Sequence, residues 1–287
     1  MRHATRGVRL TRTPPGVFSG GMDFVTSADG TRIATHSFGE GPAVVIVGGA
    51  LSRAQDAEDL ARALADAGVQ AVTYDRRARG DSDDTPPAAP EREVEDLAAV
   101  IAAASETGTE AGSGAAVLGH SSGAVLALFA AGHGVPMTRL FLSEPPFRFD
   151  EGDPASDLAD RLQALVDDGR PEEAVITFQR EGVGLPEEFI EQFRSSPAFA
   201  AMAPLGQSTV YDTLVTQRVS TPTAEMLGVR MPVTILCGVQ TMPLLTTAAT
   251  RLGEMMPDAE YLEVPESVGH RIHPEATARI VAERLEA

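Results

Sequence analysis

The sequence predicts an α/β fold, in which a mostly parallel sheet has helices on both faces and carries a helical cap. Short apolar runs alternate with longer helical segments on either side of residues 146–228, as right-handed strand–helix–strand crossovers require. Some runs, such as Ala43-Val-Val-Ile-Val47, are apolar at every position, which is typical of strands buried on both faces. Residues 146–228 show helical periodicity and no strand pattern.

The first two strands form a hairpin, because the turn Ala28-Asp29-Gly30 separates strand-like residues 22–26 and 31–38. Further strands are expected at residues 43–47, 69–74, 115–118, 139–142, 233–236 and 261–264. Helices of the sheet domain are expected at residues 56–67, 91–105, 122–131 and 274–285. Helices of the cap are expected at residues 158–168, 171–181, 186–195 and 209–219.

The pattern divides the chain into three regions. Residues 1–21 are rich in arginine, proline and glycine, and we expect them to form a flexible N-terminal arm. Residues 22–145 and 229–287 form the core domain. Residues 146–228 form the cap.

Composition narrows the class of partner. The 287-residue chain has a formal net charge of −18, which repels phosphate backbones and anionic lipid headgroups. We therefore expect a small-molecule substrate, no nucleic acid and no membrane, and leave a homodimer open. Cys237 is the only cysteine, so no internal disulfide ties the fold to an oxidising compartment. No segment approaches the roughly 20 apolar residues that cross a bilayer, and a cytoplasmic location is expected.

The most specific motif is Gly119-His120-Ser121-Ser122-Gly123, between an apolar strand and an apolar helix. A serine in such a sharp strand-to-helix turn projects its hydroxyl above the sheet, and the small neighbours let the turn close. The helix N-terminus also directs free N–H groups and its positive dipole end at the hydroxyl oxygen. Ser121 is therefore the candidate nucleophile, whereas His120 is expected to shape the turn or pack beneath it.

A serine nucleophile needs a general base, and His270 is the leading candidate among six histidines. It lies in the loop between the last strand and the last helix, after the serine in the chain. His273 stands directly before Pro274 and is expected to help start the final helix, but it stays open as an alternative base. His3, His36 and His133 are expected to be surface or packing residues.

In strand order, serine turn and C-terminal histidine, residues 22–285 resemble the α/β-hydrolase superfamily. The segments Asp75–Ser82 and Ser143–Phe147 are similar to those of a group of actinobacterial hydrolases. The resemblance implies a cap that roofs the active site, and an oxyanion hole made by the backbone N–H groups of Ser122 and Ala50. Gly49 is the alternative to Ala50 as this second backbone donor. The residues expected to line an apolar substrate pocket are Leu51, Phe147 and Phe178, with Phe189, Phe193 and Met202 as further candidates.

The triad acid departs from the family pattern. Many members place an aspartate shortly after the strand that follows the cap, but this chain reads Cys237-Gly-Val-Gln-Thr-Met-Pro243 there. The acid orients the imidazole and stabilises its charged form. Glu144 is the candidate replacement, because its strand end faces the same crevice as the nucleophile. A hinge carboxylate before Pro145 is the alternative reading of Glu144. Asp75 and Asp81 are more distant candidates, expected to be solvated loop residues.

Three functions fit these residues. The first is acyl transfer to water from an ester, lactone or thioester, through an acyl-enzyme. The second is a non-hydrolytic lyase or cyclase of secondary metabolism, in natural-product tailoring, with His270 as the base. The third is a low-turnover ligand-binding protein that keeps the pocket. No zinc motif, P-loop or dinucleotide-binding loop is recognisable, so neither a metal nor an organic cofactor is expected.

Overall fold

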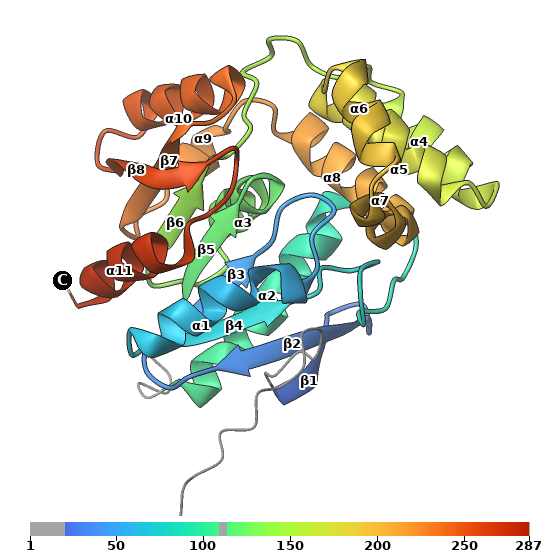
Figure 1. Ribbon diagram of the computed structural model, residues 1–287. Helices are drawn as coiled ribbons and strands as arrows, with labels where there is room; N and C mark the ends of the chain where they lie inside the picture. The colour runs from blue at the N-terminus through green and yellow to red at the C-terminus, as the bar shows by residue number, and fades with distance from the viewer. Residues whose placement is uncertain (1–20, 109–113, 287) are drawn as a thin grey trace, which may run out of the picture.

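The computed structural model describes residues 21–108 and 114–286, which form an eight-stranded sheet flanked by helices (Figure 1). The strand order is β1-β2-β4-β3-β5-β6-β7-β8. Strands β1 and β2 pair antiparallel with their neighbours, and all other pairs are parallel. The strands are β1 (Gly21–Thr26), β2 (Arg32–Phe38), β3 (Ala43–Val47), β4 (Gln70–Tyr74), β5 (Ala116–His120), β6 (Leu140–Ser143), β7 (Val233–Gln240) and β8 (Glu260–Val268). The mostly parallel sheet expected from the sequence is confirmed. Apart from Gly21, the expected arm of residues 1–21 lies outside the described residues.

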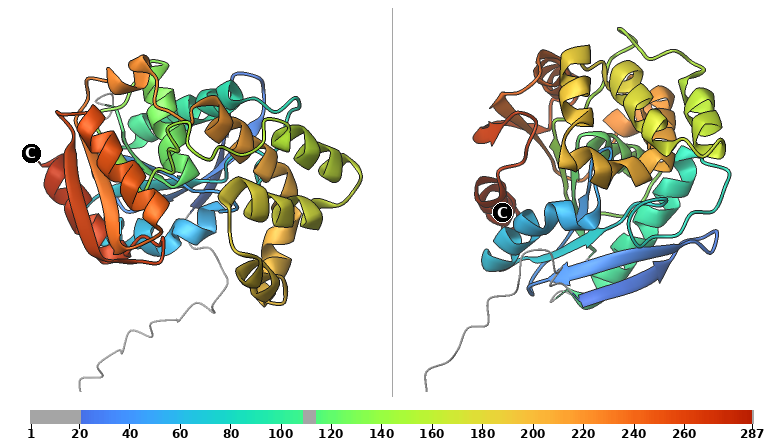
Figure 2. Two further views of the ribbon diagram at one scale, coloured as in Figure 1. Left: turned by 90° about the horizontal axis from the view of Figure 1, so that it is seen from above. Right: turned by 45° about the vertical axis from the view of Figure 1, so that its right-hand side comes forward.

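Helices cover both faces of the sheet (Figure 2). Helices α1 and α11 share one face with the apolar residues Val44 and Ile46 of β3. Helices α2, α3 and α10 share the other face with Val45 and Val47 of the same strand. Successive strand residues point to opposite faces, so a strand buried on both sides has to be apolar at every position. The helices are α1 (Glu58–Asp66), preceded by the short η1 (Ala54–Ala57), α2 (Pro90–Thr107), α3 (Ser122–Gly132), α10 (Pro243–Met255) and α11 (Pro274–Leu285).

Residues 146–228, called the helical segment below, contain helices and no strand in the described structure. The segment has an apolar cluster of its own, which includes Leu158, Leu162, Val175 and Phe178. In Figures 1 and 2, α4 to α7 form a group set apart from the sheet. Helix α8 connects this group to α2 and α3. The elements are α4 (Leu158–Asp167), α5 (Pro171–Thr177), the π-helical turn η2 (Phe178–Val183), α6 (Glu187–Arg194), α7 (Pro197–Met202), η3 (Ala203–Leu205), α8 (Gly206–Arg218) and α9 (Ala224–Leu227).

The chain after the helical segment is more regular than the sequence pattern indicates. Helix α10 was not expected, because its threonines and alanines give a weak apolar stripe. It nevertheless begins at Pro243, a residue well suited to a first helical position, and buries Ala248 and Leu252 against the sheet. Strand β8 is also longer than expected and contains Pro265. A proline is tolerated there because β8 is an edge strand, whose outer N–H groups need no partner.

None of the helices in the two described ranges is both long and apolar enough to cross a bilayer.

Candidate active site

The candidate catalytic residues gather at the carboxyl ends of neighbouring strands. Ser121 follows β5, Glu144 follows β6 and His270 follows β8. Parallel strands end at the same edge of the sheet, so these three positions meet in one crevice. The pairing of β5 with β6 brings the first two side by side, because the Ser121 N–H donates to the carbonyl oxygen of Ser143 at 2.9 Å.

Ser121 occupies a strained turn between strand β5 and helix α3. Its backbone angles are φ 54° and ψ −128°, a region that serine rarely adopts outside functional turns. Gly123 allows this turn to close, because a Cβ there would lie 2.3 Å from the carbonyl oxygen of Val47. Helix α3 begins immediately after Ser121, so its positive end lies at the serine hydroxyl.

A continuous series of hydrogen bonds joins the three side chains. His270 Nε2 lies 2.9 Å from Ser121 Oγ, and His270 Nδ1 lies 2.5 Å from Glu144 Oε2. The structure thus brings together the nucleophile, base and acid that the sequence analysis selects. His273, the alternative base, instead accepts a hydrogen bond from Ala276 N at 3.4 Å and caps α11, as expected.

Strand β7 and the residue that follows it supply hydrogen-bond donors to Glu144. Gly238 N–H donates to Glu144 Oε1 at 2.9 Å, and Thr241 Oγ1 donates to Oε2 at 3.1 Å. The Glu144 side chain is nearly buried, and burial alone would raise its pKa. Hydrogen bonds from His270, Gly238 and Thr241 outweigh burial and lower the pKa of Glu144 below its ordinary value. The carboxylate therefore stays ionised beside the imidazole at neutral pH.

The more distant acid candidates lie outside this series of hydrogen bonds. The expectation that Asp75 is a solvated loop residue is wrong, because it is only 3% exposed. Its carboxylate accepts hydrogen bonds from Ala54 N at 2.7 Å and Asp81 N at 2.9 Å, which brace two loops against each other. Asp81 is exposed, as expected.

His120 packs against the candidate base. The two imidazole ring centroids are 4.7 Å apart, and His120 Nδ1 lies 3.1 Å from Ser143 Oγ. Burial, together with the nearby His270, lowers the pKa of His120 to about 4. His120 is therefore neutral near pH 7, and it supports the His270 ring without adding a second positive charge.

The loop between β3 and η1 lies directly against the serine turn. A Cβ on Gly49 would stand 3.0 Å from Ser121 Cβ, so any side chain at this position would push the loop away. Gly49 and Ala50 both line the cavity beside Ser121, as does Ser122. The three residues selected for the oxyanion hole are therefore next to the serine hydroxyl.

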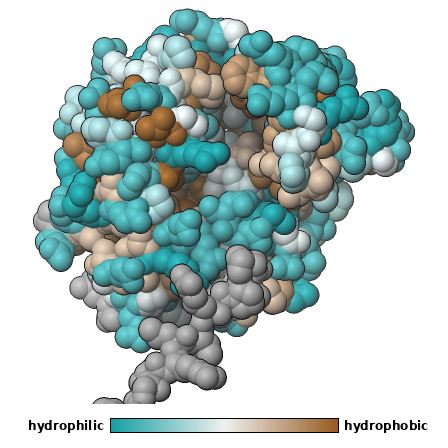
Figure 3. Space-filling model, in the orientation of Figure 1, coloured by the Kyte–Doolittle hydropathy of each residue, from teal (hydrophilic) through white to brown (hydrophobic). Residues whose placement is uncertain are grey.

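The cavity beside Ser121 has a volume of about 780 Å³ and a mostly apolar lining. Figure 3 shows the surface hollowed between the sheet and the helical segment, with apolar residues at the hollow. Both parts of the chain contribute apolar lining residues, which are Ala50, Leu51, Pro146, Phe178, Val183, Leu185, Phe193, Met202, Met242, Pro243, Leu244 and Leu245. In the described ranges, no cluster of three or more His, Cys, Asp or Glu residues is arranged to hold a metal ion.

Two of the expected pocket residues lie elsewhere. Phe147 is 1% exposed and packs in the main core, while its neighbours Pro146 and Arg148 line the cavity. The reason is that the chain leaves β6 through Glu144, whose φ is +48°, and this turn directs Phe147 inward. Phe189 is 57% exposed on the surface of α6.

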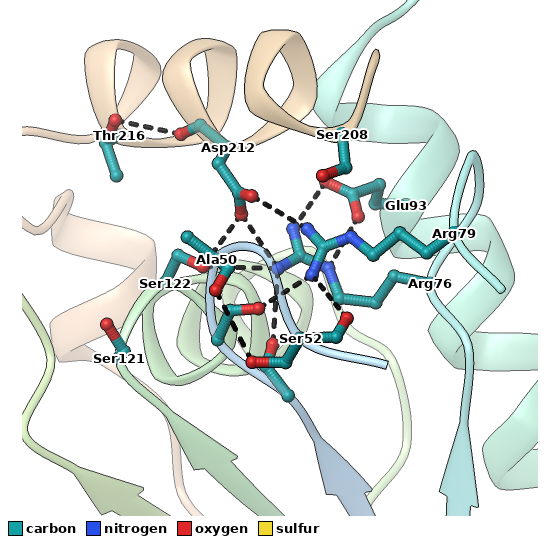
Figure 4. A network of polar contacts seen from close by, with 12 residues as sticks. Ala50, Ser52, Arg76, Arg79, Glu93, Ser121, Ser122, Ser208, Asp212 and Thr216 are labelled. Carbon is teal, nitrogen blue, oxygen red and sulfur yellow. Dashed lines mark hydrogen bonds and ion pairs between the residues drawn. The ribbon is translucent and has the colours of Figure 1, made fainter. Parts of the chain in front are cut away.

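Sequence reasoning missed a buried ionic network between the serine turn and helix α8 (Figure 4). Arg76, Arg79 and Asp212 are each at most 2% exposed, although the loop after β4 reads as a polar surface loop. Ser122 Oγ donates to Asp212 Oδ1 at 2.8 Å, which joins the network to the first residue of α3. A signal was present in the sequence, because Asp212 is the single charged residue in the otherwise uncharged middle of α8. Its arginine partners lie more than a hundred residues away.

The chain is similar to known proteins both in sequence and in fold. The model of the alpha/beta hydrolase family matches residues 34–283. A solved alpha/beta hydrolase from Sphaerobacter thermophilus is 39% identical, with a TM-score of 0.81 over 92% of this chain and 100% of that chain. An esterase from Thermogutta terrifontis is 17% identical, with a TM-score of 0.66 over 93% of this chain and 97% of that one. An enol-lactonase from Burkholderia xenovorans is 16% identical, with a TM-score of 0.60 over 92% and 100%. At these lower identities the likeness is one of fold. A search of curated proteins finds no match.

Proposed function

The chain belongs to the alpha/beta hydrolase family, and on that premise we propose that it is a serine-dependent hydrolase acting through an acyl-enzyme on Ser121. The proposed substrates are esters, lactones or thioesters. The observation that carries the proposal is the series of hydrogen bonds from Ser121 through His270 to Glu144, at 2.9 and 2.5 Å. Such a series activates a serine hydroxyl, which is otherwise a weak nucleophile.

In the acylation step, Ser121 Oγ attacks the carbonyl carbon while its proton moves to His270 Nε2. Glu144 accepts a hydrogen bond from the Nδ1–H of His270 and stabilises the imidazolium that forms. The negative charge on the substrate oxygen is held by the backbone N–H groups of Ser122 and Ala50. His270 then gives its proton to the leaving oxygen or sulfur, which departs and leaves the acyl group on Ser121.

Water completes the cycle. His270 removes a proton from a water molecule, whose oxygen attacks the acyl carbon in the same oxyanion hole. The Ser121 oxygen leaves and recovers the proton from His270. The product is a carboxylic acid, and the enzyme returns to its starting state.

The cavity favours a neutral, apolar substrate. We assign the helical segment the role of a cap, because Phe178, Phe193 and Met202 form one wall of the cavity beside Ser121. Its volume of about 780 Å³ is in the range of small-molecule sites. Arg148 also lines it, but its terminal nitrogens bind the carbonyl oxygens of Gly152 and Gly182 at 2.9 and 2.7 Å. These bonds fix the guanidinium against the backbone of the helical segment, and most of the side chains around it in this wall are apolar.

The structural neighbours act on carbonyl groups of the proposed kind. Their descriptions include an esterase, an enol-lactonase and a thioesterase domain from a curacin biosynthetic pathway. These proteins are at most 20% identical to this chain, so they support the reaction class and do not identify a substrate.

Turnover of a substrate panel tests the proposal. Wild type and Ser121→Ala are compared on nitrophenyl esters of increasing acyl length, on lactones and on acyl thioesters. We expect wild type to hydrolyse at least one neutral class and Ser121→Ala to lose at least about 10⁴-fold in kcat. A folded wild type that turns over none of them, but converts a polyketide-like substrate to an eliminated or cyclised product, would favour the lyase or cyclase hypothesis.

A further inference from the structure

A buried ion cluster lies between the serine turn and helix α8, outside the proposed path of the proton (Figure 4). Arg76 binds both carboxylate oxygens of Glu93, at 2.7 and 2.8 Å, and Asp212 Oδ1 at 2.9 Å. Arg79 binds Asp212 Oδ2 at 2.8 Å. All four side chains are at most 2% exposed. Two guanidinium groups balance two carboxylates, which is the condition under which charges are tolerated in a dry interior.

The same arginines hold the loop that follows β3. Arg79 Nη1 donates to the carbonyl oxygens of Gly49 at 2.7 Å and Ser52 at 3.3 Å, and Arg76 Nη1 donates to that of Gly48 at 3.2 Å. The C=O and N–H of one trans peptide point in opposite directions. Because the Gly49 carbonyl points at Arg79, the N–H of the same peptide, which belongs to Ala50, points away from it. The arginines therefore fix the direction of an N–H group assigned to the oxyanion hole.

Asp212 joins this loop to two other elements. It lies on α8, in the helical segment, and accepts a hydrogen bond from Ser122 Oγ at 2.8 Å. Burial alone would raise the pKa of Asp212, but the charges of Arg79 and Arg76 hold it below its ordinary value. The carboxylate is thus a permanent negative charge between two arginines. Without it, both guanidinium groups would share Glu93 as their remaining counter-charge within the cluster.

We propose that Asp212 is a positioning residue, which acts through Arg76 and Arg79 to hold the β3–η1 loop with the Ala50 N–H directed at the oxyanion. Helix α8 is then part of the hydrolytic machinery as well as a wall of the cap. The inference rests on the proposed serine hydrolase function. Because the oxyanion exists only in the transition state and the tetrahedral intermediate, a displaced loop lowers kcat more than it changes substrate binding.

The test compares Asp212→Asn with Asp96→Asn, a matched control in the same loop system. Asp96 binds Arg77 through two bonds of 2.7 Å, and both partners are as buried as Arg79 and Asp212. No hydrogen bond in the described structure links this pair to Gly49, Ser52 or Ser122. We expect both variants to lower Tm. Only Asp212→Asn should lower kcat, by about 10- to 100-fold with KM within about threefold.

A second variant keeps the proposal testable if Asp212→Asn fails to fold. Arg79→Lys retains a positive charge opposite Asp212 but loses the planar fork that reaches Gly49, Ser52 and Asp212 together. We expect its Ki for a trifluoromethyl ketone, which forms an oxyanion adduct with an active serine, to rise about 10-fold or more. Its Ki for the corresponding methyl ketone, which binds without an oxyanion, should stay within about threefold.

The outcomes separate the two proposals. If wild type and Asp96→Asn turn over no ester, lactone or thioester of the panel, the serine hydrolase function fails and the positioning role fails with it. If both turn over an ester and Asp212→Asn keeps the same kcat, or if Asp96→Asn loses as much, the hydrolase function stands and the positioning role is wrong. A folded Arg79→Lys whose two Ki values change in parallel would also overturn it.

Discussion

Two polar networks meet at the serine turn, and they differ in exposure and in charge. On one side, His270 and Glu144 approach Ser121, and the His270 side chain is 24% exposed at the cavity. On the other side, Arg76, Arg79 and Asp212 lie between Ser122 and helix α8, with side chains that are 0 to 2% exposed. The first network has the His270 imidazole in its middle, which takes up and releases a proton in the proposed reaction. The second consists of paired full charges.

The difference reflects two tasks in one reaction. A proton shuttle needs a group that titrates near neutral pH and can reach substrate and water. Orientation of backbone dipoles needs charges that stay fixed throughout the cycle. Burial would lower the pKa of Arg76, but Glu93 and Asp212 raise it above the ordinary value. Burial and the neighbouring Arg76 lower the pKa of Arg79, but a guanidinium titrates so far above neutral pH that both groups stay charged. Changes in the first network should therefore alter the pH dependence of the reaction, and changes in the second should alter its rate alone.

Replacement of the base should break the first network most severely. We expect His270→Gln to reduce kcat by about 10⁴-fold or more, because in the described part of the chain no other side chain is hydrogen-bonded to Ser121 Oγ. His273→Gln is the control, since His273 caps α11, and it should lower Tm while kcat stays within about twofold. The measurement is kcat of both variants, from steady-state kinetics on the best substrate of the panel. Comparable losses in the two variants would mean that His270 is not the base.

Removal of the acid's charge should have the next largest effect. Glu144→Gln keeps the shape of the side chain but cannot stabilise the imidazolium, so we expect kcat to fall by about 10²- to 10⁴-fold. KM should change little, because Glu144 is buried behind His270. A kcat within threefold of wild type would leave Glu144 as a hinge carboxylate without a part in the chemistry.

The ionised Glu144 of the first network should also make the free energy of unfolding depend on pH. The pKa of folded Glu144 is below its ordinary value of 4.5, so its stabilising contribution is complete above pH 4.5 and is lost as the pH falls through the folded value. Wild type should therefore lose stability relative to Glu144→Gln as the pH falls from about 6 to about 3. Urea unfolding of both proteins across this window measures the difference, and other carboxylates cancel in the comparison. A difference that does not vary with pH would contradict the hydrogen-bonded, ionised Glu144 described here.

The smallest expected effect concerns the contact between the second network and the serine turn. Ser122→Ala removes the hydroxyl that binds Asp212 but keeps the backbone N–H assigned to the oxyanion hole. The hydroxyl also accepts a hydrogen bond from Arg76 Nη1 at 3.2 Å. The loss of the two bonds, of about 1 kcal/mol together, corresponds to a fall in kcat of about 3- to 10-fold, at all pH values alike. A shift in the pH profile of kcat, measured on the same substrate, would show that the two networks are not separate in function.

The first network was largely predictable because most of its signals are local. The turn around Ser121 and the loop of His270 are recognisable from a few adjacent residues each. Glu144 required topology as well, since only the order of β5, β6 and β7 places its carboxylate beside His270. The second network was missed because Asp212 and Arg79 are 133 residues apart, and arginines in a loop ordinarily indicate solvent.

The inward turn of Phe147 was missed for a similar reason. Its direction depends on the positive φ of Glu144, which no pattern of residue types reports. Likewise, the donors Gly238 and Thr241 became recognisable only from the pairing of β6 with β7, which brings both residues within hydrogen-bond distance of Glu144.

An activated Ser121 is the central claim, and its reaction with a fluorophosphonate tests it most directly. Intact-protein mass spectrometry of folded wild type should show a single adduct that is absent from Ser121→Ala and forms more slowly on Glu144→Gln. No adduct on the folded wild type, or an adduct that persists in Ser121→Ala, would contradict a serine hydrolase acting through this residue.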